Sequence, residues 1–230
     1  MAIFLVSKSI DDLHTQAINE FTEGNFKNLD LLHHMTAGVK SFATEMCYNG
    51  LDELRQSCGG AGFLLSSGLS DWWSDIAPFP TFEGVNPVMA QQASRLIFKN
   101  ADKVAKGKQP LPIFEYLSKS DELTSARSAA KTASEFATVE HIEQALAVRA
   151  AVAIKEVREA MKASPAHKKV QENEIFATDI SRMTRLHLIY VTFKMGRKRL
   201  EGSQFTDLKV QKHLFTGLKI FALKQLLSDN

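Results

Sequence analysis

A single carboxylate, Glu83, stands just ahead of a predicted helix in the segment TFEGVNPVMAQQASRLIFK, residues 81–99. Asn86 is a good N-cap residue and Pro87 suits the first helical turn, so the helix is expected to start there, with Glu83 in the preceding turn. A carboxylate that is held in a fixed turn beside Phe82 and partly removed from water can act as a general base. The alternative is that Glu83 is a solvated loop acid, or that it only favours the positive end of the helix dipole.

A second stretch with chemical potential is LRQSCGGAGFLLSSGL, residues 54–69, where Gly59 and Gly60 follow a short predicted helix. Because glycines lack side chains, a phosphate or a planar ring can approach their backbone closely. Glycines also stop helices and form turns. The spacing matches neither the dinucleotide-binding fingerprint nor the P-loop, so both interpretations stay open.

Several other reactive residue types are better explained by packing. His33 and His34 are adjacent, and no further ligand follows at helical spacing, so a packed histidine is expected and no metal site. Trp72 and Trp73 could line an acyl groove, but we expect them to anchor the long loop by burying apolar area. Cys58 has no neighbouring histidine in the sequence and is interpreted as a structural thiol.

The elements that must position these residues are helices, because apolar residues recur at steps of three and four. The predicted helices cover residues 2–22, a stretch that begins at Asp30 and packs closely at Gly38, and residues 51–57, 87–99, 138–163, 172–199 and 203–228. Residues 59–80 are expected to form a loop. Since no segment alternates like a strand, the predicted fold class is all-α, a helical bundle followed by a second helical domain.

The division into domains follows from a polar stretch that contains Lys106, Gly107 and two prolines. We predict a first helical domain over residues 1–105, a linker over 106–120 and a second helical domain over 121–230. A chain of 230 residues with 44% hydrophobic residues is long enough to bury such a core.

Composition also limits the class of protein. Two cysteines are too few for a disulfide framework, which favours a reducing intracellular compartment. No run approaches the roughly 20 apolar residues of a membrane span, so none is expected.

Charge is unevenly distributed along the chain. Residues 1–99 carry six Lys or Arg against eleven Asp or Glu, and residues 100–230 carry 22 against 15. The basic residues are spread at helical spacing without an aromatic-interleaved patch, so we expect solvated helix faces and no nucleic-acid partner. The GRKR segment at residues 196–199 is expected near a helix end, where it favours the dipole.

Three blocks together carry a resemblance to a known family: LLHHMTAGVKSF, LDELRQSCGGAGFLLSSGL and TFEGVNPVMAQQASRLIFK. In this order and approximate spacing they resemble the carboxy-terminal half of the peroxisomal acyl-CoA oxidases, which are part of the acyl-CoA dehydrogenase superfamily. The similarity is dense from about Leu31 to Lys99. The later helices look like the second carboxy-terminal helical domain of that family.

The resemblance implies an oxidoreductase that uses FAD to desaturate an acyl-CoA to the trans-2-enoyl form and passes the electrons to O₂, making H₂O₂ in fatty-acid β-oxidation. In that family the glutamate of a Glu-Gly-x-Asn turn is the catalytic base, and Glu83, Gly84 and Asn86 occupy this motif. The chemistry is consistent, since the weakly acidic α-proton of a thioester needs a positioned base opposite an electron-accepting flavin.

The resemblance also implies contacts to cofactor and substrate. Backbone contacts to the flavin, commonly that of a neighbouring subunit, are carried over to Cys58, Gly59 and Gly60, with Arg55 and Gln56 as companions. Asn86 is likewise expected on the cofactor side, and Gly84 is expected to contact the acyl-CoA substrate. The implied assembly is a homo-oligomer, or a complex with a separate chain that supplies the amino-terminal and β-domains absent here.

This sequence also departs from the family pattern. Ala61 and Phe63 replace the usual His and Tyr, and Val85 and Pro87 replace an acidic residue and a Thr or Tyr. The chain is expected to begin inside the first helix of the family's third domain and to end without a peroxisomal tripeptide of the Ser-Lys-Leu type. A peroxisomal location is still expected from the resemblance, with mitochondria as the alternative.

These departures keep a second function open. The chain is not expected to be active alone, and the alternative is a non-catalytic helical interaction subunit derived from an acyl-CoA oxidase. A basic helical nucleic-acid binder is the weakest of the three hypotheses.

Overall fold

The structure is a computed structural model that describes residues 1–125, 127–203, 205 and 207–228. Its principal helices are α1 (Ala2–Thr22), α2 (Leu29–Ser57), α3 (Leu69–Ile76), α4 (Asn86–Ala105), α7 (Val139–Ala163), α9 (Ala177–Gly202) and α10 (Leu208–Leu227). Shorter elements are η1 (Gly59–Gly62), η2 (Leu65–Ser67), η3 (Pro112–Lys119), α5 (Ser120–Ser125), α6 (Ala133–Phe136), α8 (Lys168–Val170) and the π-helix η4 (Gln171–Ile175). The described residues form no strand, and the all-α prediction is confirmed.

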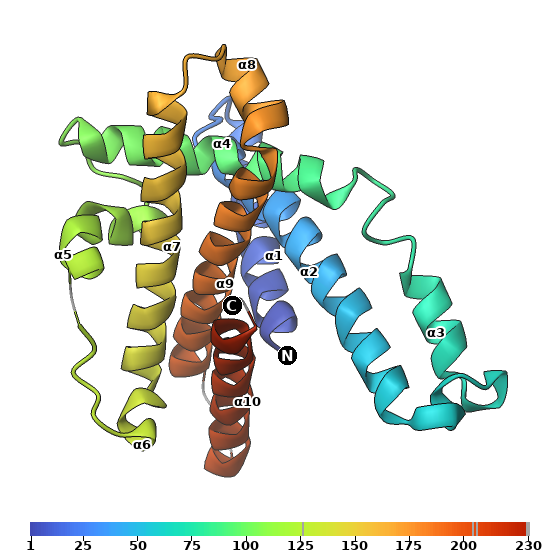
Figure 1. Ribbon diagram of the computed structural model, residues 1–230. Helices are drawn as coiled ribbons and strands as arrows, with labels where there is room; N and C mark the ends of the chain where they lie inside the picture. The colour runs from blue at the N-terminus through green and yellow to red at the C-terminus, as the bar shows by residue number, and fades with distance from the viewer. Residues whose placement is uncertain (126, 204, 206, 229–230) are drawn as a thin grey trace.

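Helix α9 is the central element of the bundle (Figure 1). It packs against α1, α2, α4, α7 and α10. From Met183 to Phe193 every residue except Arg185 is buried, as expected for a helix surrounded by others. None of the helices in the described ranges is long and apolar enough to cross a membrane.

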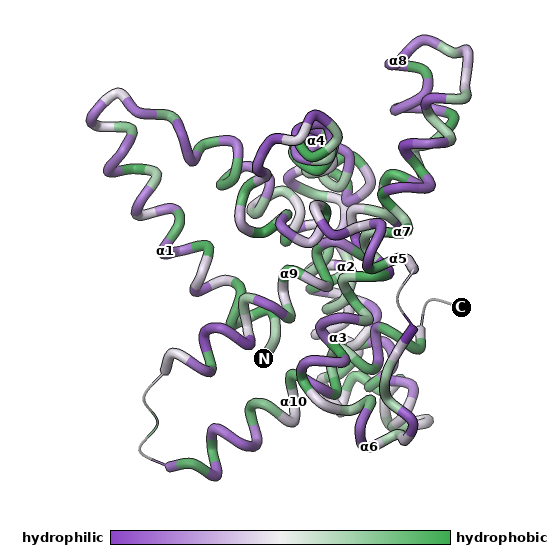
Figure 2. The backbone as a smooth tube through the Cα atoms, turned by 90° about the vertical axis from the view of Figure 1, so that its left-hand side faces the viewer, coloured by the Kyte–Doolittle hydropathy of each residue, from purple (hydrophilic) through white to green (hydrophobic). Residues whose placement is uncertain are grey.

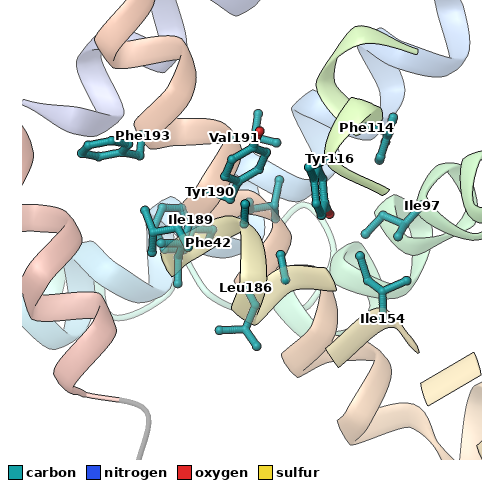
Figure 3. Packing of buried hydrophobic residues seen from close by; sticks show 14 of the residues in the cluster. Phe42, Ile97, Phe114, Tyr116, Ile154, Leu186, Ile189, Tyr190, Val191 and Phe193 are labelled. Atoms are coloured by element: carbon teal, nitrogen blue, oxygen red, sulfur yellow. The ribbon is translucent and has the colours of Figure 1, made fainter. Parts of the chain in front are cut away.

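The hydrophobic core runs through both predicted domains. It includes Val6 of α1, Ile97 of α4, Ile154 of α7 and Phe193 of α9. The expected linker contributes as well, because residues 112–119 form η3 and bury Phe114, Tyr116 and Leu117 (Figure 3). Residues 112–119 are therefore packed into the core, and the division into two domains stays a prediction.

The long helices agree with the sequence periodicity. Helix α7 begins one residue after the predicted start, because the Thr138 hydroxyl accepts a hydrogen bond from the His141 amide as its N-cap. Close packing at Gly38 is confirmed, since a Cβ there would lie 2.8 Å from a methyl group of Leu188. Helices α9 and α10 each begin about five residues later than predicted.

Two predictions about the middle of the chain were wrong. Residues 51–57 are the last turns of α2 and not a separate helix, because α2 continues through Gly50 without a break. The expected loop at residues 59–80 contains α3. Trp73 of this helix packs against Tyr48 of α2, with ring centroids 5.5 Å apart, as the anchoring interpretation predicts, whereas Trp72 is exposed.

The second half of α2 and α3 project from the bundle as an arm, whose far end carries η1 and η2 (Figure 1). Viewed from the side, α1 and α10 extend away from the bundle on the side opposite α7 and α8 (Figure 2). Several large apolar side chains of the arm are exposed: Leu54, Phe63, Leu64, Leu65 and Trp72.

A buried chain of hydrogen bonds joins four elements of the core: α2, α4, α9 and η3. His34 of α2 donates from Nδ1 to the Ala93 carbonyl oxygen at 2.8 Å, so its Nε2 accepts from His187 Nε2 at 3.2 Å. His187 Nδ1 in turn accepts from the Tyr116 hydroxyl at 2.8 Å. The prediction of a packed histidine is confirmed for His34, and no group of residues in the described ranges could hold a metal ion.

Two arginines of the basic GRKR segment, residues 196–199, have different roles. Arg199 lies in the last turn of α9, as the dipole interpretation predicts. Arg197 instead bonds to Glu140 and Glu143 of α7 at 2.9 and 3.0 Å, and to Glu201 at 2.7 Å. The guanidinium of Arg197 therefore joins α9 to α7.

Candidate functional site

Glu83 lies in the turn before α4, as predicted, and has an unusual backbone conformation. Its φ is +55°, and no other non-glycine residue of the described ranges has a positive φ. Gly84 follows with a φ of +100°, and a Cβ at this position would lie 2.6 Å from the sulfur of Met89. The left-handed region costs a non-glycine residue on the order of 1–3 kcal/mol, so the surroundings must hold the turn in place.

Side chains of α2 provide this hold. Lys40 Nζ donates to the Gly84 carbonyl oxygen at 2.5 Å and to Asn86 Oδ1 at 3.0 Å. Thr44 Oγ1 donates to the same Asn86 oxygen at 3.1 Å, and Ser41 Oγ donates to the Asn86 carbonyl at 3.0 Å. The residues after Glu83 are thus bonded to one face of α2.

The predicted N-cap role of Asn86 was wrong. Helix α4 begins at Asn86 itself, with Val85 as the N-cap residue and Pro87 in the first turn, and no side chain caps this end. The Asn86 side chain turns to α2 because Lys40 and Thr44 donate to its oxygen. Asn86 is buried, and its Nδ2 group has no hydrogen-bond partner in the described part of the chain.

Glu83 is exposed. The expectation that its carboxylate is partly removed from water is therefore not met within this chain alone. Phe82 beside it is also exposed and packs edge-to-face on Phe79, with ring centroids 5.1 Å apart. The Glu83 carboxylate interacts electrostatically with the Lys40 ammonium group. Partial burial lowers the pKa of the Lys40 ammonium, and the Glu83 carboxylate opposes this effect by raising it.

A cavity of about 340 Å³ lies beside the start of α4, between α2 and α9. Its lining residues are Ser41, Phe42, Glu45, Asn86, Pro87, Ala90, Thr178, Ser181, Arg182, Arg185 and Leu188. Asn86 connects this cavity to the Glu83 turn, whereas Glu83 does not line it. The cavity therefore offers polar groups close to the turn but no direct contact to the carboxylate.

The glycine pair lies where α2 ends, at the tip of the arm. Gly59 has a φ of +57° and ends the helix after Cys58, which agrees with the helix-stop interpretation. A Cβ at Gly59 or Gly60 would meet nothing within 4 Å, so their outer surface is open. Gly62 differs, since a Cβ there would lie 1.8 Å from the Arg55 carbonyl oxygen.

Arg55 and Gln56, the expected companions of the glycine pair, are bonded within the arm. Arg55 Nη2 donates to Asp52 Oδ1 at 2.6 Å, and its guanidinium carbon lies 5.4 Å from the centre of the Trp73 ring. Gln56 Nε2 donates to Asp52 Oδ2 at 2.6 Å. Hydrogen bonding by Arg55 lowers the pKa of the Asp52 carboxyl group. Both side chains are thus held at the end of α2, beside Cys58.

The structure does not bring the two predicted parts of the site together within one chain. Lys40 lies beside the Glu83 turn, and Ser57 ends the same helix. At a rise of about 1.5 Å per residue, these two positions are roughly 25 Å apart. Glu83 and the glycine pair therefore occupy opposite ends of the α2 and α3 arm (Figure 1).

Comparison with known proteins identifies the first half of this architecture. A family model described as "Acyl-CoA oxidase, C-alpha1 domain" matches residues 1–98, which carry both parts of the candidate site. Residues 1–98 are therefore similar to the C-alpha1 domain of the acyl-CoA oxidases. The resemblance inferred from the three sequence blocks is confirmed.

Curated relatives extend the match beyond the C-alpha1 domain. Peroxisomal acyl-coenzyme A oxidase 1 of Mus musculus is 28% identical over 211 residues, which is 88% of this chain and 32% of the mouse protein. The protein of the same name in Pongo abelii is 30% identical and covers 92% of this chain and 33% of its own length. The chain therefore spans about a third of the length of these relatives.

Solved acyl-CoA oxidase structures share the fold. Arabidopsis thaliana acyl-CoA oxidase 1 has a TM-score of 0.91 at 24% identity and covers 98% of this chain and 34% of its own. Acyl-CoA oxidase-2 of Caenorhabditis elegans, bound with FAD, ascaroside-CoA and ATP, has a TM-score of 0.77 at 23% identity and covers 94% of this chain and 32% of its own. The fold is that of the carboxy-terminal helical region of an acyl-CoA oxidase.

Proposed function

We propose that this chain is the carboxy-terminal part of an FAD-dependent acyl-CoA oxidase, which desaturates acyl-CoA to trans-2-enoyl-CoA and reduces O₂ to H₂O₂. The observation that carries the proposal is the turn of Glu83 and Gly84, held in an unusual conformation at the surface of an acyl-CoA oxidase domain. Strained backbone of this kind is often found at functional sites. Glu83 is the proposed base that removes the α-proton of the thioester.

The exposure of Glu83 is consistent with a site completed by other polypeptide. A base for this reaction needs a substrate positioned against it and water excluded from the reacting atoms. This chain supplies the carboxylate and the rigid turn, while the rest of the acyl-CoA surface would come from regions of the relatives that this sequence does not cover. The exposed apolar side chains of the arm, such as Phe63 and Leu65, fit a surface that further polypeptide covers.

The residues present fit an FAD cofactor at two places. The open surface over Gly59 and Gly60 admits a group close to the backbone, and the buried Asn86 Nδ2 group is a donor without a partner in the described chain. When bound, FAD supplies the acceptor for the hydride that leaves the β-carbon. One cofactor molecule would be held by the backbone of Cys58, Gly59 and Gly60, with Arg55 and Gln56 behind them. Asn86 would contact part of a second cofactor molecule.

The separation of these two places favours an oligomer. Since roughly 25 Å of α2 lies between the Glu83 turn and the glycine pair, the glycine pair of one chain cannot line the same ring as its own Glu83. We therefore propose that the glycine pair contacts the cofactor of a neighbouring copy. Relatives named as peroxisomal oxidases support a peroxisomal location. The comparisons do not favour the alternative of a non-catalytic interaction subunit.

The experiment that tests the proposal combines this chain with a polypeptide that carries the amino-terminal and β-domains of an acyl-CoA oxidase. The purified assembly should show a flavin absorption spectrum and form H₂O₂ when an acyl-CoA is added in air. If no combination of the two halves retains a flavin, the enzymatic proposal is wrong.

A further inference from the structure

Lys40 is the one charged side chain of α2 that bonds to the turn of Glu83, and the resemblance assigns it no role. We propose that Lys40 is a positioning residue, which fixes the backbone of the Glu83 turn and places a positive charge beside its carboxylate. The catalytic meaning of this role rests on the proposed function of Glu83. Its structural part concerns this chain alone and is tested separately.

The first argument is the geometry of the turn. A non-glycine residue with positive φ persists only where its surroundings over-determine the conformation. Lys40 Nζ bonds to the Gly84 carbonyl oxygen, directly after Glu83, and also to Asn86 Oδ1, where α4 begins. A single ammonium group therefore bonds to both residues that fix the direction of the chain after Glu83.

The second argument is the position of the charge. The Lys40 side chain is half-buried between α2 and the turn, and desolvation lowers the pKa of its ammonium group while Glu83 raises it. The two groups thus interact electrostatically. The Lys40 ammonium, which bonds to the residue directly after Glu83, therefore brings a positive charge to the turn that carries the proposed base.

Lysine suits this task better than a neutral donor. Thr44 and Ser41 also bond to Asn86, but neither reaches the Gly84 carbonyl and neither carries a charge. Hydrogen bonds from charged donors are roughly twice as strong as those between neutral groups. Loss of Lys40 should therefore loosen the turn, while the bonds of Ser41 and Thr44 to Asn86 remain.

The first test measures the turn itself in this chain. In Lys40→Met the Asn86 amide, which donates to the Pro80 carbonyl oxygen at 2.9 Å across the turn, should lose about tenfold or more of its hydrogen-exchange protection, because a charged hydrogen bond that holds the turn is removed. The buried amides of α9 should keep theirs. Lys108→Met, an exposed lysine beyond the other end of α4, is the matched control and should change neither region. Unchanged protection of the Asn86 amide in Lys40→Met would overturn the positioning role.

The second test measures the charge interaction and does not depend on the folding of a Lys40 variant. Glu83→Gln removes an exposed carboxylate, so the Lys40 ammonium, followed by NMR, should titrate at lower pH than in the unmodified chain. A Glu23→Gln variant, at the end of α1, should leave this titration unchanged. If Glu83→Gln also leaves it unchanged, the charge of Lys40 does not act on Glu83.

The assembled enzyme gives the third readout. Lys40→Met and Lys40→Gln should lower kcat by about tenfold or more with little change in KM, and Lys40→Arg should recover part of this loss because it restores the charge. A rise in KM at unchanged kcat would contradict the role. Equal activity of the Met and Arg variants would contradict it as well. An assembly without oxidase activity would refute the proposed function, while the exchange and titration results would still decide the role of Lys40 in the turn.

Discussion

Acidification should destabilise this fold through the histidines buried between α2 and α9. Burial lowers the pKa of His34 from 6.5 to about 4 and that of His187 well below its usual value. The Tyr116 hydroxyl remains neutral, because burial raises its pKa well above the usual value. The unfolded chain therefore binds protons at these histidines at a higher pH than the folded chain does, and their contribution to stability is lost as pH falls from about 6.5 towards 4.

The size of the effect follows from the pKa shift of His34. With an unfolded value near 6.5 and a folded value of about 4, this one side chain should cost about 2 kcal/mol between pH 7 and pH 5. His34 is 1% exposed, so solvent does not screen this effect. His187 is fully buried and adds to the loss in the same direction.

Urea denaturation at pH 7, 6 and 5, followed by circular dichroism, measures this loss. His34→Asn replaces the ring by an amide that does not titrate, so the fall in unfolding free energy between pH 7 and pH 5 should be about 2 kcal/mol smaller than in the unmodified chain. His213→Asn, an exposed position on α10, should leave the pH dependence unchanged. The reasoning is refuted if His34→Asn and the unmodified chain lose the same stability over this range.

Two further substitutions test the packing of the arm and of the core. Gly62→Ala places a methyl group 1.8 Å from the backbone oxygen of Arg55, so it should lower the free energy of unfolding by about 1–3 kcal/mol. Gly60→Ala places its methyl group in open space and should not lower this free energy. Urea titrations of the two variants measure the difference. Phe114→Ala truncates a fully buried ring of η3 that stacks on His187 at 4.8 Å, and thermal and urea unfolding should show a loss of about 3–5 kcal/mol.

The sequence was most informative where local signals agree with tertiary packing. For α7, the apolar line from Ile142 to Val157, the cap at Thr138 and the proline after the helix all act within the segment itself. Its limits were therefore predicted to within one residue. Helix α3 was missed because its position depends on a distant contact, the packing of Trp73 on Tyr48, and not on its own periodicity.

The candidate site was predictable only in part for the same reason. The motif placed Glu83 in a turn before α4, and the structure agrees. Its partner Lys40 lies 44 residues before Gly84, and no spacing in the sequence marks that contact. The cap role of Asn86 was wrong because α2 offers its oxygen two donors, which compete with the local amides.

The separation of the glycine pair from Glu83 was also outside the reach of sequence reasoning. The two blocks are neighbours in the sequence, but α2 and α3 run out and back as an arm, which places them at opposite ends (Figure 1). The separation arises because α2 continues through Gly50 to Ser57, and the sequence had predicted a break in the helix before residue 51.

The most direct test of the central claim is the rate of H₂O₂ formation by the assembled oxidase with Glu83→Gln. Loss of a general base costs about 10²- to 10⁴-fold in rate, so this variant should lose that much activity while the assembly still binds FAD. Glu23→Gln, which changes an exposed carboxylate at the end of α1, should keep the original rate. A Glu83→Gln assembly that retains its flavin and forms H₂O₂ at the original rate would contradict the assignment of Glu83 as the base.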